Sequence, residues 1–472
     1  MAPPIGVDEW VARSEERLEG VAGLRGTAAR AMTRVGWWPR FAVVGALGAL
    51  FPLLGPNDFQ LQVGVNALLL AMLALGLNIS VGWAGLLDLG YIAFYGFGAY
   101  GFALLSSDQL GANGIHLPAT LSIPIVMVAA ALLGLLLGLP SRRLIGDYLA
   151  IVTLFFGELF LEVTNNVATK QLGGPNGIPA VDPIKAFGTQ ILTLKGYFYL
   201  VLVVILLAMA ALHLLDNSRT GRAWRAVRED SLAAGLMTIP VNRVKLMAFS
   251  FGAVVAALAG TLFAAQQGGV FPSDFDTPFL ILIYAGLILG GSGSIAGAVL
   301  GGLVVSITLE FLRNPTEAGY IFYGIILATL IGTMRPWRKL GAVLAALVAF
   351  GFAAHAIVKA ISASAVAGGP HSGGWVGSVL EHWVIVPANS KTPGNVGFVI
   401  LVCSLIAVVQ LKNRWLRTVL LVPIIYLAAC VWEARLVVEP SVTRQILIGA
   451  ILIVMMNARP NGLLGRRRVE VV

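Results

Sequence analysis

Long runs of apolar residues constrain this chain more than any other feature of its sequence. They recur from Phe41 to residue 458, and many are long enough to cross a bilayer as a helix. Hydrophobic residues make up 58% of the chain and charged residues 12%, which is about half of the charged fraction usual in soluble proteins. Because a backbone in lipid must satisfy its hydrogen bonds internally, these runs predict an all-α polytopic membrane protein.

The apolar runs divide the chain into membrane spans joined by short polar segments. A bundle of about ten core spans is expected, and about four extra spans follow it toward the C-terminus. The run at 278–291 is short, so a broken or re-entrant helix is an alternative there. The core spans are placed at about 41–55, 61–81, 84–106, 117–139, 148–165, 197–215, 246–266, 278–291, 292–312 and 320–335, and the extra spans at about 341–362, 395–411, 417–434 and 443–458.

Basic residues gather on one side of this map. With the N-terminus inside, 24 of the 32 Lys and Arg residues fall in segments that face the cytoplasm. Lys and Arg in short loops keep those loops on the cytoplasmic side. The distribution predicts a multi-pass protein of the cell inner (plasma) membrane with both termini in the cytoplasm. It also argues against nucleic acid as a partner, although the net charge is +9.

Residues for covalent chemistry or metal binding are not grouped in the sequence. Cys403 and Cys430 both lie in apolar runs, and the five His residues form no cluster with ligand spacing. The Gly-rich stretch 290–294 lacks the Gly-Lys-Ser/Thr ending of a phosphate-binding loop. We therefore expect a transporter component without a cofactor in this chain, and neither an enzyme nor an ATPase.

The segment before the first span, residues 1–40, mixes apolar and basic side chains. Its apolar residues recur mostly at helical spacing, and its arginines occupy other positions. An amphipathic helix on the cytoplasmic membrane surface is expected, and a disordered basic tail is the alternative.

The segment 219–245, called the basic loop below, is the longest strongly charged stretch after the N-terminus. Six basic residues outweigh Glu229 and Asp230 in it. A helix is expected over 222–237, with Pro240 stopping it. It is either a solvated helix on the membrane surface or a docking helix for a cytoplasmic partner. Its apolar residues follow an imperfect helical stripe made of Trp224, Val227, Leu232 and Leu236.

Polar residues inside the expected spans are candidates for a translocation path. Glu158 is the clearest, because a charge at the bilayer centre costs about 2.5–3.5 kcal/mol and usually faces the bundle interior. The alternative is a protonated Glu158 or one bonded to a neighbouring backbone. The other candidates could instead hold helices together. The full set is Asn78, Ser80, Asp88, Thr153 and Glu158.

Small residues recur at four-residue spacing late in the core. Such rows let helix backbones approach closely in a membrane. We therefore expect helix packing through Gly286, Gly290, Gly293, Gly297 and Gly301. The intervening Gly-Gly-Ser-Gly-Ser stretch, 290–294, is expected to form a turn.

Motifs along the core resemble one family. The segment Gly76–Tyr100, with its Gly-Leu-Asn, Gly-Trp-Ala-Gly and Phe-Tyr-Gly-Phe-Gly-Ala-Tyr pieces, is similar to a signature of LivM-like and LivH-like permeases. The basic loop contains Arg-Ala-Val-Arg-Glu-Asp, then Ala-Ala and Met-x-Ile. It resembles the coupling loop of ABC importer permeases, and most closely that of the LivM-type permease of branched-chain amino-acid importers. Further matches at 147–154, 173–178 and 289–300 extend the resemblance over roughly 41–335.

The resemblance implies a permease subunit that takes its energy from a separate ATPase, which would hold the ATP and Mg²⁺. In the basic loop, Arg228, Glu229 and Asp230 would meet the ATPase, and Ala233 and Ala234 would allow close approach. The implied partners are a LivH-like second permease, two ABC ATPase subunits, an external solute-binding protein and the lipid bilayer. The implied substrates are branched-chain amino acids. A urea or short-amide permease and an ion-coupled secondary transporter are the alternatives.

Three positions depart from the family pattern. Asp88 stands where Ser is common and Tyr91 where His is common, which bears on the substrate. Thr238 stands where the family usually has Gly, so the end of the loop helix is expected to differ.

The chain departs from the family after 335. Both Ala318–Pro336 and Ile446–Gly465 resemble the family's closing helix, so residues 336–440 are expected to be an insertion before the last span or a partial duplication of it. Residues 441–472 would then hold the final span and a basic cytoplasmic tail. An external loop at 363–394 would brace the structure or contact a partner, with metal binding by its two His as the alternative. This loop carries His371, Trp375, His382 and Trp383.

Overall fold

The structure, a computed structural model, is described here over most of the chain. The described residues are 37–110, 116–141, 146–167, 169–186, 189–313, 315–333, 337–370, 374–389, 391–410 and 414–436, with 445, 446, 449, 452, 453 and 462–465. Nearly all of the expected N-terminal amphipathic segment, and most of the last expected span, therefore lie outside them.

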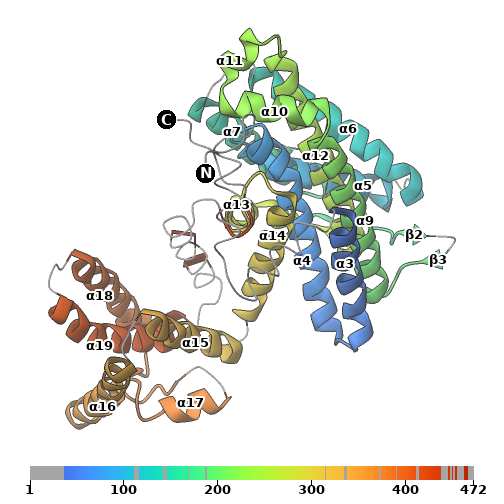
Figure 1. The fold of residues 1–472 in the computed structure, drawn as a ribbon. Helices are drawn as coiled ribbons and strands as arrows, with labels where there is room; N and C mark the ends of the chain where they lie inside the picture. The colour runs from blue at the N-terminus through green and yellow to red at the C-terminus, as the bar shows by residue number, and fades with distance from the viewer. Residues whose placement is uncertain are drawn as a thin grey trace, which may run out of the picture.

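Helices form most of the described structure, and they stand in two groups (Figure 1). The all-α class predicted from the apolar runs is therefore confirmed. The first group consists of α3 (Trp37–Leu50), α4 (Asp58–Leu77), α5 (Tyr91–Leu105), α6 (Ala119–Ser141), α7 (Asp147–Glu162), α8 (Thr169–Leu172), α9 (Leu194–Asp216), α10 (Arg219–Glu229), α11 (Ser231–Leu236), α12 (Val241–Gln267), α13 (Thr277–Gly290) and α14 (Ile295–Phe311).

The centre of the first group is built around α4 and α12. α4 packs against α9, α12, α13 and α14, while α12 also packs against α5 and α6. α4 is apolar on all sides, as expected for a helix enclosed by other helices. Small residues bring α5 and α12 together, because a Cβ on Gly98 would lie 2.2 Å from the carbonyl oxygen of Ala257. This close approach leaves no room for a larger side chain.

Six helical segments of the described chain are long and apolar enough to cross a membrane. Six shorter apolar helices of 10–17 residues accompany them. This supports the expected integral membrane protein. The long segments are Asp58–Trp83, Ala119–Pro140, Leu194–Asp216, Val241–Gln267, Pro272–Gly290 and Leu340–Ile361.

Some expected span boundaries were wrong. α4 continues through a π-helical turn, Asn78–Trp83, so the second span is longer than expected. The next helix begins only at Tyr91, because residues 84–90 form a non-helical segment that contains Gly85 at a φ of +69°. The expected span 84–106 is therefore helical only in its second part. The short run expected at 278–291 is the helix α13, which follows a 3-10 turn at Pro272–Phe275.

The second group consists of the helices that follow α14. They are α15 (Pro315–Thr333), α16 (Trp337–Ile361), α17 (Gly374–Leu380), α18 (Lys391–Gln410) and α19 (Arg414–Val431), the last continuing into a π-helical turn at Trp432–Leu436. The rings of Phe322 in α15 and Trp432 stack at 4.2 Å. The apolar cluster of Leu347, Trp383 and Tyr426 joins α16 and α19 to the segment after α17.

The C-terminal residues return to the first group. The Leu463 N–H donates to the Leu289 carbonyl at 2.9 Å, and the Leu464 N–H donates to the Gly290 carbonyl at 2.8 Å. Leu452 packs against the core of the first group. By packing, α15 belongs with the later helices and the chain end belongs with the core. The domain division expected at 335 stays a prediction.

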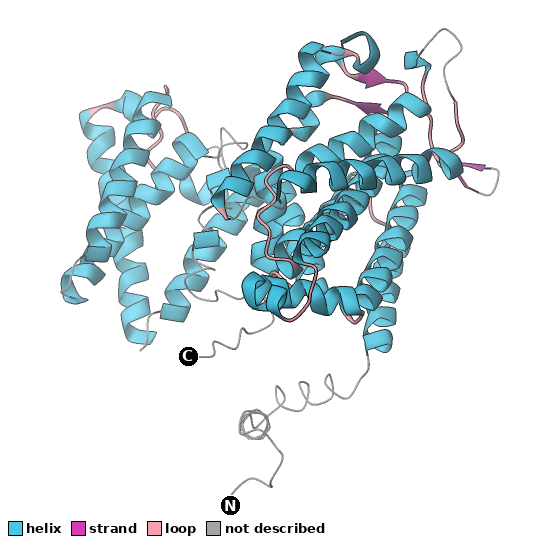
Figure 2. Cartoon of the chain, turned by 90° about the horizontal axis from the view of Figure 1, so that it is seen from above, coloured by secondary structure: helices cyan, strands magenta, loops and turns pink. Residues whose placement is uncertain are grey.

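Two short antiparallel strand pairs lie beyond the ends of the core helices (Figure 2). β1 (Ile178–Pro179) pairs with β4 (Gly269–Val270). β2 (Lys185–Ala186) pairs with β3 (Thr189–Gln190). α9 begins just after β3 and ends at the basic loop, so these strands and the basic loop stand at opposite ends of the helices.

Candidate functional site

The basic loop is folded onto the end of the core by α10. The Ser218 hydroxyl accepts a hydrogen bond from the Gly221 N–H and so caps the helix start. Arg225 approaches the buried carboxylate of Asp216 at 3.4 Å and also donates to the Asp216 carbonyl. The Trp224 ring is fully buried, and its indole N–H donates to the Val244 carbonyl at 2.8 Å. These contacts tie α10 to the end of α9 and the start of α12.

The loop does not contain the single helix expected over 222–237. α10 ends at Glu229, because Asp230 has extended backbone angles of φ −153° and ψ 110°. The Asp230 carboxylate then accepts from the N–H groups of Leu232 and Ala233 and begins a second helix, α11. The sequence prediction missed this break, although an Asp followed by helix formers is a usual start signal.

The end of α11 has the geometry that a glycine would give. Thr238 has a φ of +64°, in the left-handed region where β-branched residues are rare. The Ile239 N–H donates to the Ala234 carbonyl at 3.1 Å, which closes the end of the helix. The threonine therefore occupies a strained position, and a helix end different from that of the family stays a prediction.

The apolar stripe predicted for the loop divides into two parts. Trp224 and Val227 on α10 are buried, whereas Leu232 and Leu236 are 81% and 85% exposed. Met237 beside them is 77% exposed. We call Leu232, Leu236 and Met237 the α11 patch. Figure 1 shows α11 at the top of the molecule, at the far end of the first group.

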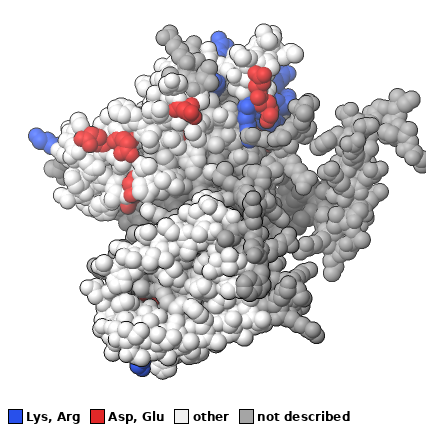
Figure 3. Space-filling model, turned by 90° about the vertical axis from the view of Figure 1, so that its left-hand side faces the viewer, with Lys and Arg blue, Asp and Glu red and all other residues white. Residues whose placement is uncertain are grey.

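The residues predicted to contact an ATPase also divide. Glu229, Asp230 and Ala233 are exposed, whereas Ala234 is buried. Arg228 is half-buried, and its guanidinium donates to the Gly82 carbonyl. Basic and acidic side chains lie close together at the end of the molecule in Figure 3. The ATPase contacts of all five residues stay predictions.

Arg228 belongs to a set of contacts that we call the junction: Asn78, Gly82, Trp83, Arg228 and Gly293. The Asn78 side-chain oxygen accepts from the Gly293 N–H at 2.7 Å. The Trp83 indole donates to the Gly293 carbonyl at 3.3 Å, and its ring stacks on Trp224 at 6.0 Å. The junction therefore connects the basic loop to the π-helical turn that ends α4 and to the turn between α13 and α14.

Glycines make room for the junction. A Cβ on Gly82 would overlap the Asn78 side chain, and one on Gly85 would lie 2.9 Å from Arg228. Gly293 has a φ of +88°, which other residues rarely adopt. Sequence reasoning placed Gly293 both in the row of packing glycines and in a turn at 290–294, and the structure places it in the turn. The Gly-Trp-Ala-Gly motif was the available signal for this site.

The other glycines of the row lie where α13 meets α14. A Cβ on Gly301 would lie 1.9 Å from the Gly286 carbonyl oxygen, and one on Gly290 would lie 1.9 Å from that of Gly297. The two backbones are therefore in direct contact, and this contact fixes the turn that carries Gly293.

The predicted path residues do not form one group. Asn78 is in the junction, and the Ser80 hydroxyl donates to the Leu77 carbonyl of its own helix. The side chains of Asp88 and Thr153 are buried around the 84–90 segment, where Thr153 accepts from the Leu89 N–H at 3.0 Å. Their role in a path stays a prediction.

Glu158 occupies a different environment from the other four. It lies on the exposed side of α7 and accepts a hydrogen bond from the Thr277 hydroxyl at the start of α13. Glu162, one turn further on, is also exposed. The described partner of Glu158 is a side chain, and the alternatives of a protonated Glu158 or a backbone partner stay untested.

The segment 363–394, expected to be an external loop, holds a packed tryptophan. Trp383 is mostly buried, contacts Tyr426 at 5.1 Å and donates to the Val348 carbonyl. His371 lies outside the described residues. Among the residues that are described, no three His, Cys, Asp or Glu side chains are arranged to hold a metal ion.

The comparisons with known proteins cover both the junction and α11. The family model for the "Branched-chain amino acid transport system / permease component" matches residues 60–334. The chain belongs to this permease family. The permease is 36% identical over 304 residues to the "High-affinity branched-chain amino acid transport system permease protein LivM" of Escherichia coli, covering 59% of this chain and 69% of the relative.

Two other permease proteins are also similar to this chain. The permease is 28% identical over 292 residues to the BraD permease protein of Pseudomonas aeruginosa, which covers 57% of this chain and 91% of the relative. It is 34% identical over 170 residues to the LivH permease protein of Escherichia coli, which covers 35% of this chain and 54% of the relative. No solved structure matches the chain. The LivM-type resemblance is confirmed, and the matches support neither a secondary transporter nor a membrane enzyme.

Proposed function

We propose that this chain is the LivM-type permease subunit of an ATP-driven importer for branched-chain amino acids in the plasma membrane. It would pair with a LivH-like permease, receive substrate from an external solute-binding protein and be driven by two ATPase subunits that hold ATP and Mg²⁺. Both termini and the basic loop would face the cytoplasm. The names of the relatives support the substrate class, and the basic residues of the loop support its cytoplasmic side.

The α11 patch is the observation that carries the ATPase contact. Three large apolar side chains at the tip of a charged loop are costly to leave in water, and exposed apolar patches mark protein contact sites. Ala233 is exposed beside them and leaves space for a partner. The patch is therefore suited to a groove on a cytoplasmic protein, with Glu229 and Asp230 at its edge.

The junction supplies a route from that contact into the membrane. Movement of α11 would act on α10, whose Trp224 and Arg228 touch Trp83 and Gly82. Those residues end α4, the central helix, and their neighbour Gly293 joins α13 to α14. A π-helical turn is often found at functional sites, where its irregular hydrogen bonding permits adjustment. ATP-driven closure could thus shift three core helices at once.

The exposed side of α7 is the proposed surface of the translocation path. Glu158 and Glu162 lie there, in the helix that corresponds to the span expected at 148–165, and each would cost about 2.5–3.5 kcal/mol if it faced lipid at the bilayer centre. A polar neighbour removes this cost. We infer that the second permease faces α7 across a water-containing path.

Uptake of labelled leucine tests the proposal. Cells that lack the chain would be compared with cells in which it is restored, under ATP depletion or with the proton gradient collapsed by an ionophore. We expect uptake that requires the chain and ATP and survives the ionophore. Uptake abolished by the ionophore at constant ATP would overturn the ATP-driven mechanism. Uptake of urea or short amides without leucine would overturn the substrate.

A further inference from the structure

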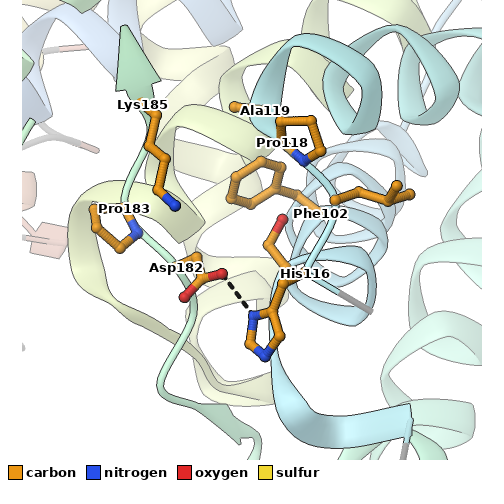
Figure 4. Close-up of a pocket in the computed structure, with 9 residues that line it drawn as sticks. Phe102, His116, Pro118, Ala119, Asp182, Pro183 and Lys185 are labelled. Carbon is orange, nitrogen blue, oxygen red and sulfur yellow. Dashed lines mark hydrogen bonds and ion pairs between the residues drawn. The ribbon is translucent and has the colours of Figure 1, made fainter. Parts of the chain in front are cut away.

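A small pocket opens at the end of the core opposite the basic loop. It has a volume of about 70 Å³ and lies between the end of α5, the start of α6 and the segment leading into β2. Figure 4 shows Asp182, Pro183 and Lys185 on one side and Phe102 and Pro118 on the other. In the proposed topology this end faces the outside of the cell. None of the residues singled out in the sequence lies here.

Hydrogen bonds hold the two sides of the pocket together. The Asp182 N–H donates to the Ser106 carbonyl at 2.8 Å, and the Leu117 N–H donates to the Leu105 carbonyl at 2.9 Å. The His116 ring lies between two carboxylates, 2.7 Å from Asp182 and 2.8 Å from Asp108. The pocket is therefore fixed by contacts that do not use its interior.

One buried polar atom points to a ligand. Ser106 is 1% exposed and lines the pocket, yet its hydroxyl has no hydrogen-bond partner among the described residues. A buried hydroxyl without a partner costs free energy, so such groups are nearly always bonded to protein, water or ligand. A molecule that entered the pocket would be a source of the missing partner.

The pocket wall also carries positive and negative groups. Lys185 makes no ion pair with any described residue, and Ala119 in the pocket wall is the first residue of the long helix α6, whose dipole is positive at this end. Both favour a carboxylate. One carboxylate oxygen of Asp182 bonds His116, and the other has no bond to a described residue. It can accept from an ammonium group.

We propose that this pocket binds the ammonium and carboxylate groups of a free amino acid at the outer mouth of the permease. The carboxylate would lie between Lys185, Ser106 and the start of α6, and the ammonium group would bind Asp182. This inference rests on the proposed function, which it extends to a substrate contact on the permease itself.

The size and the apolar wall agree with that ligand. A volume of about 70 Å³ is small, so the pocket would take the ammonium and carboxylate end of an amino acid and not the whole molecule. Phe102, Leu117 and Pro118 provide an apolar wall for the aliphatic side chain. The site would hold an amino acid briefly as it leaves the binding protein and before it enters the membrane.

Equilibrium binding of labelled leucine to the purified permease–ATPase complex, without the binding protein, tests the proposal. Competition would be measured with unlabelled leucine, with 4-methylpentanoate, which lacks the ammonium group, and with 3-methylbutylamine, which lacks the carboxylate. We expect unlabelled leucine to compete and both analogues to be about tenfold weaker, since each loses a charge-assisted contact.

Substitutions assign the contacts. Lys185→Met and Ser106→Ala should weaken leucine binding, the first by about tenfold. In Lys185→Met, 3-methylbutylamine should bind about as tightly as leucine, because the carboxylate no longer gains a contact with the lysine. A general loss of folding would not change this ratio of affinities. Lys170→Met, an exposed lysine of α8 outside the pocket, is the matched control and should bind leucine normally.

Parallel uptake assays separate this inference from the proposed function. Chain-dependent, ATP-driven leucine uptake with no direct leucine binding, or with binding unchanged in Lys185→Met and Ser106→Ala, would overturn the pocket alone. Equal competition by both analogues would also overturn it. Absence of any chain-dependent leucine uptake would overturn the proposed function, and the pocket assignment with it.

Discussion

At the scale of single residues, the backbone of Thr238 has an unfavourable conformation. Its φ of +64° is unfavourable for an L-residue by about 1–2 kcal/mol, and glycine avoids this penalty. Glycine gives part of the gain back through its greater freedom in the unfolded chain. The residue ends α11, beside the α11 patch, so relief of the strain should rigidify the proposed docking element.

We predict that Thr238→Gly stabilises the protein by about 1 kcal/mol. Thermal unfolding of the purified protein, with hydrogen exchange of residues 237–240, would measure the effect. Thr238→Ala is the matched control, because alanine keeps the unfavourable φ and should not stabilise. A lower unfolding midpoint for Thr238→Gly would contradict the prediction.

His116 is the second residue with a measurable consequence. Hydrogen bonds to Asp182 and Asp108 raise the pKa of its imidazole above the ordinary value of 6.5. A raised folded-state pKa means that the folded protein binds the proton more tightly than the unfolded chain does. The resulting stabilisation is fully present below pH 6.5 and is lost as the pH rises through the folded-state pKa.

We predict that His116→Gln lowers the unfolding temperature at acidic pH and that the difference shrinks as the pH increases. Unfolding curves of both proteins between about pH 5 and pH 9 would measure it. In an Asp108→Asn, Asp182→Asn background, His116→Gln should no longer give a pH-dependent difference. A difference that grows with pH would show that the neutral ring makes the important contact.

At the scale of elements, the break between α10 and α11 gives the basic loop two roles. α10 is anchored by Trp224 and Arg228, while α11 carries exposed leucines beyond the Asp230 cap. In one continuous helix, the packing of α10 on the core would also have fixed the directions of the Leu232 and Leu236 side chains. The break lets one element pack on the core and the next face outward.

We predict that Leu236→Asp prevents copurification of the ATPase subunits while the permease still inserts into the membrane. Leu236 is 85% exposed, so the change removes apolar contact area without disturbing the core. The control is Leu192→Asp, which makes the same change at a leucine 73% exposed at the opposite end of the core. Normal copurification with Leu236→Asp would remove α11 from the docking surface.

At the scale of the whole molecule, the helices form two packed groups, and the exposed surface of the first is not uniformly apolar. The second group has apolar clusters of its own, and the chain end returns to α13. The family match ends at 334, after α15, whose packing is with the second group. The carboxylates of α7 remain exposed in this single chain, which indicates that the first group is completed by another subunit.

We predict that Glu158→Leu lowers leucine uptake without lowering the amount of protein in the membrane. The substituted side chain lacks the carboxylate and its hydrogen bond to Thr277, so the proposed path loses a polar group. An apolar side chain carries no free-energy cost in lipid, so insertion should be unaffected. Glu158→Gln keeps a hydrogen-bond acceptor and should retain more uptake. Leu207→Ala, on the exposed side of α9, is the control and should transport normally. Unchanged uptake in Glu158→Leu would remove Glu158 from the path.

The sequence by itself determined the class of the protein, and it predicts a cytoplasmic position for the basic loop. Apolar runs of membrane length can satisfy their backbones in lipid as helices, and loops rich in arginine are held in the cytoplasm, so both features follow from local composition. The Gly286–Gly301 row also predicted a close contact between helices. Gly293 lies in the turn expected at 290–294, between the two helices that the other glycines of the row bring together.

Only the tertiary structure decided which of the polar residues work together. Asn78, Gly82, Arg228 and Gly293 are far apart in the chain, and they meet because α4, α10 and the α13–α14 turn end at the same level. The pocket at the opposite end likewise needs loops from three segments. Spacing along a sequence predicts which residues share one face of a helix. Contacts between the ends of different helices depend on how those helices pack.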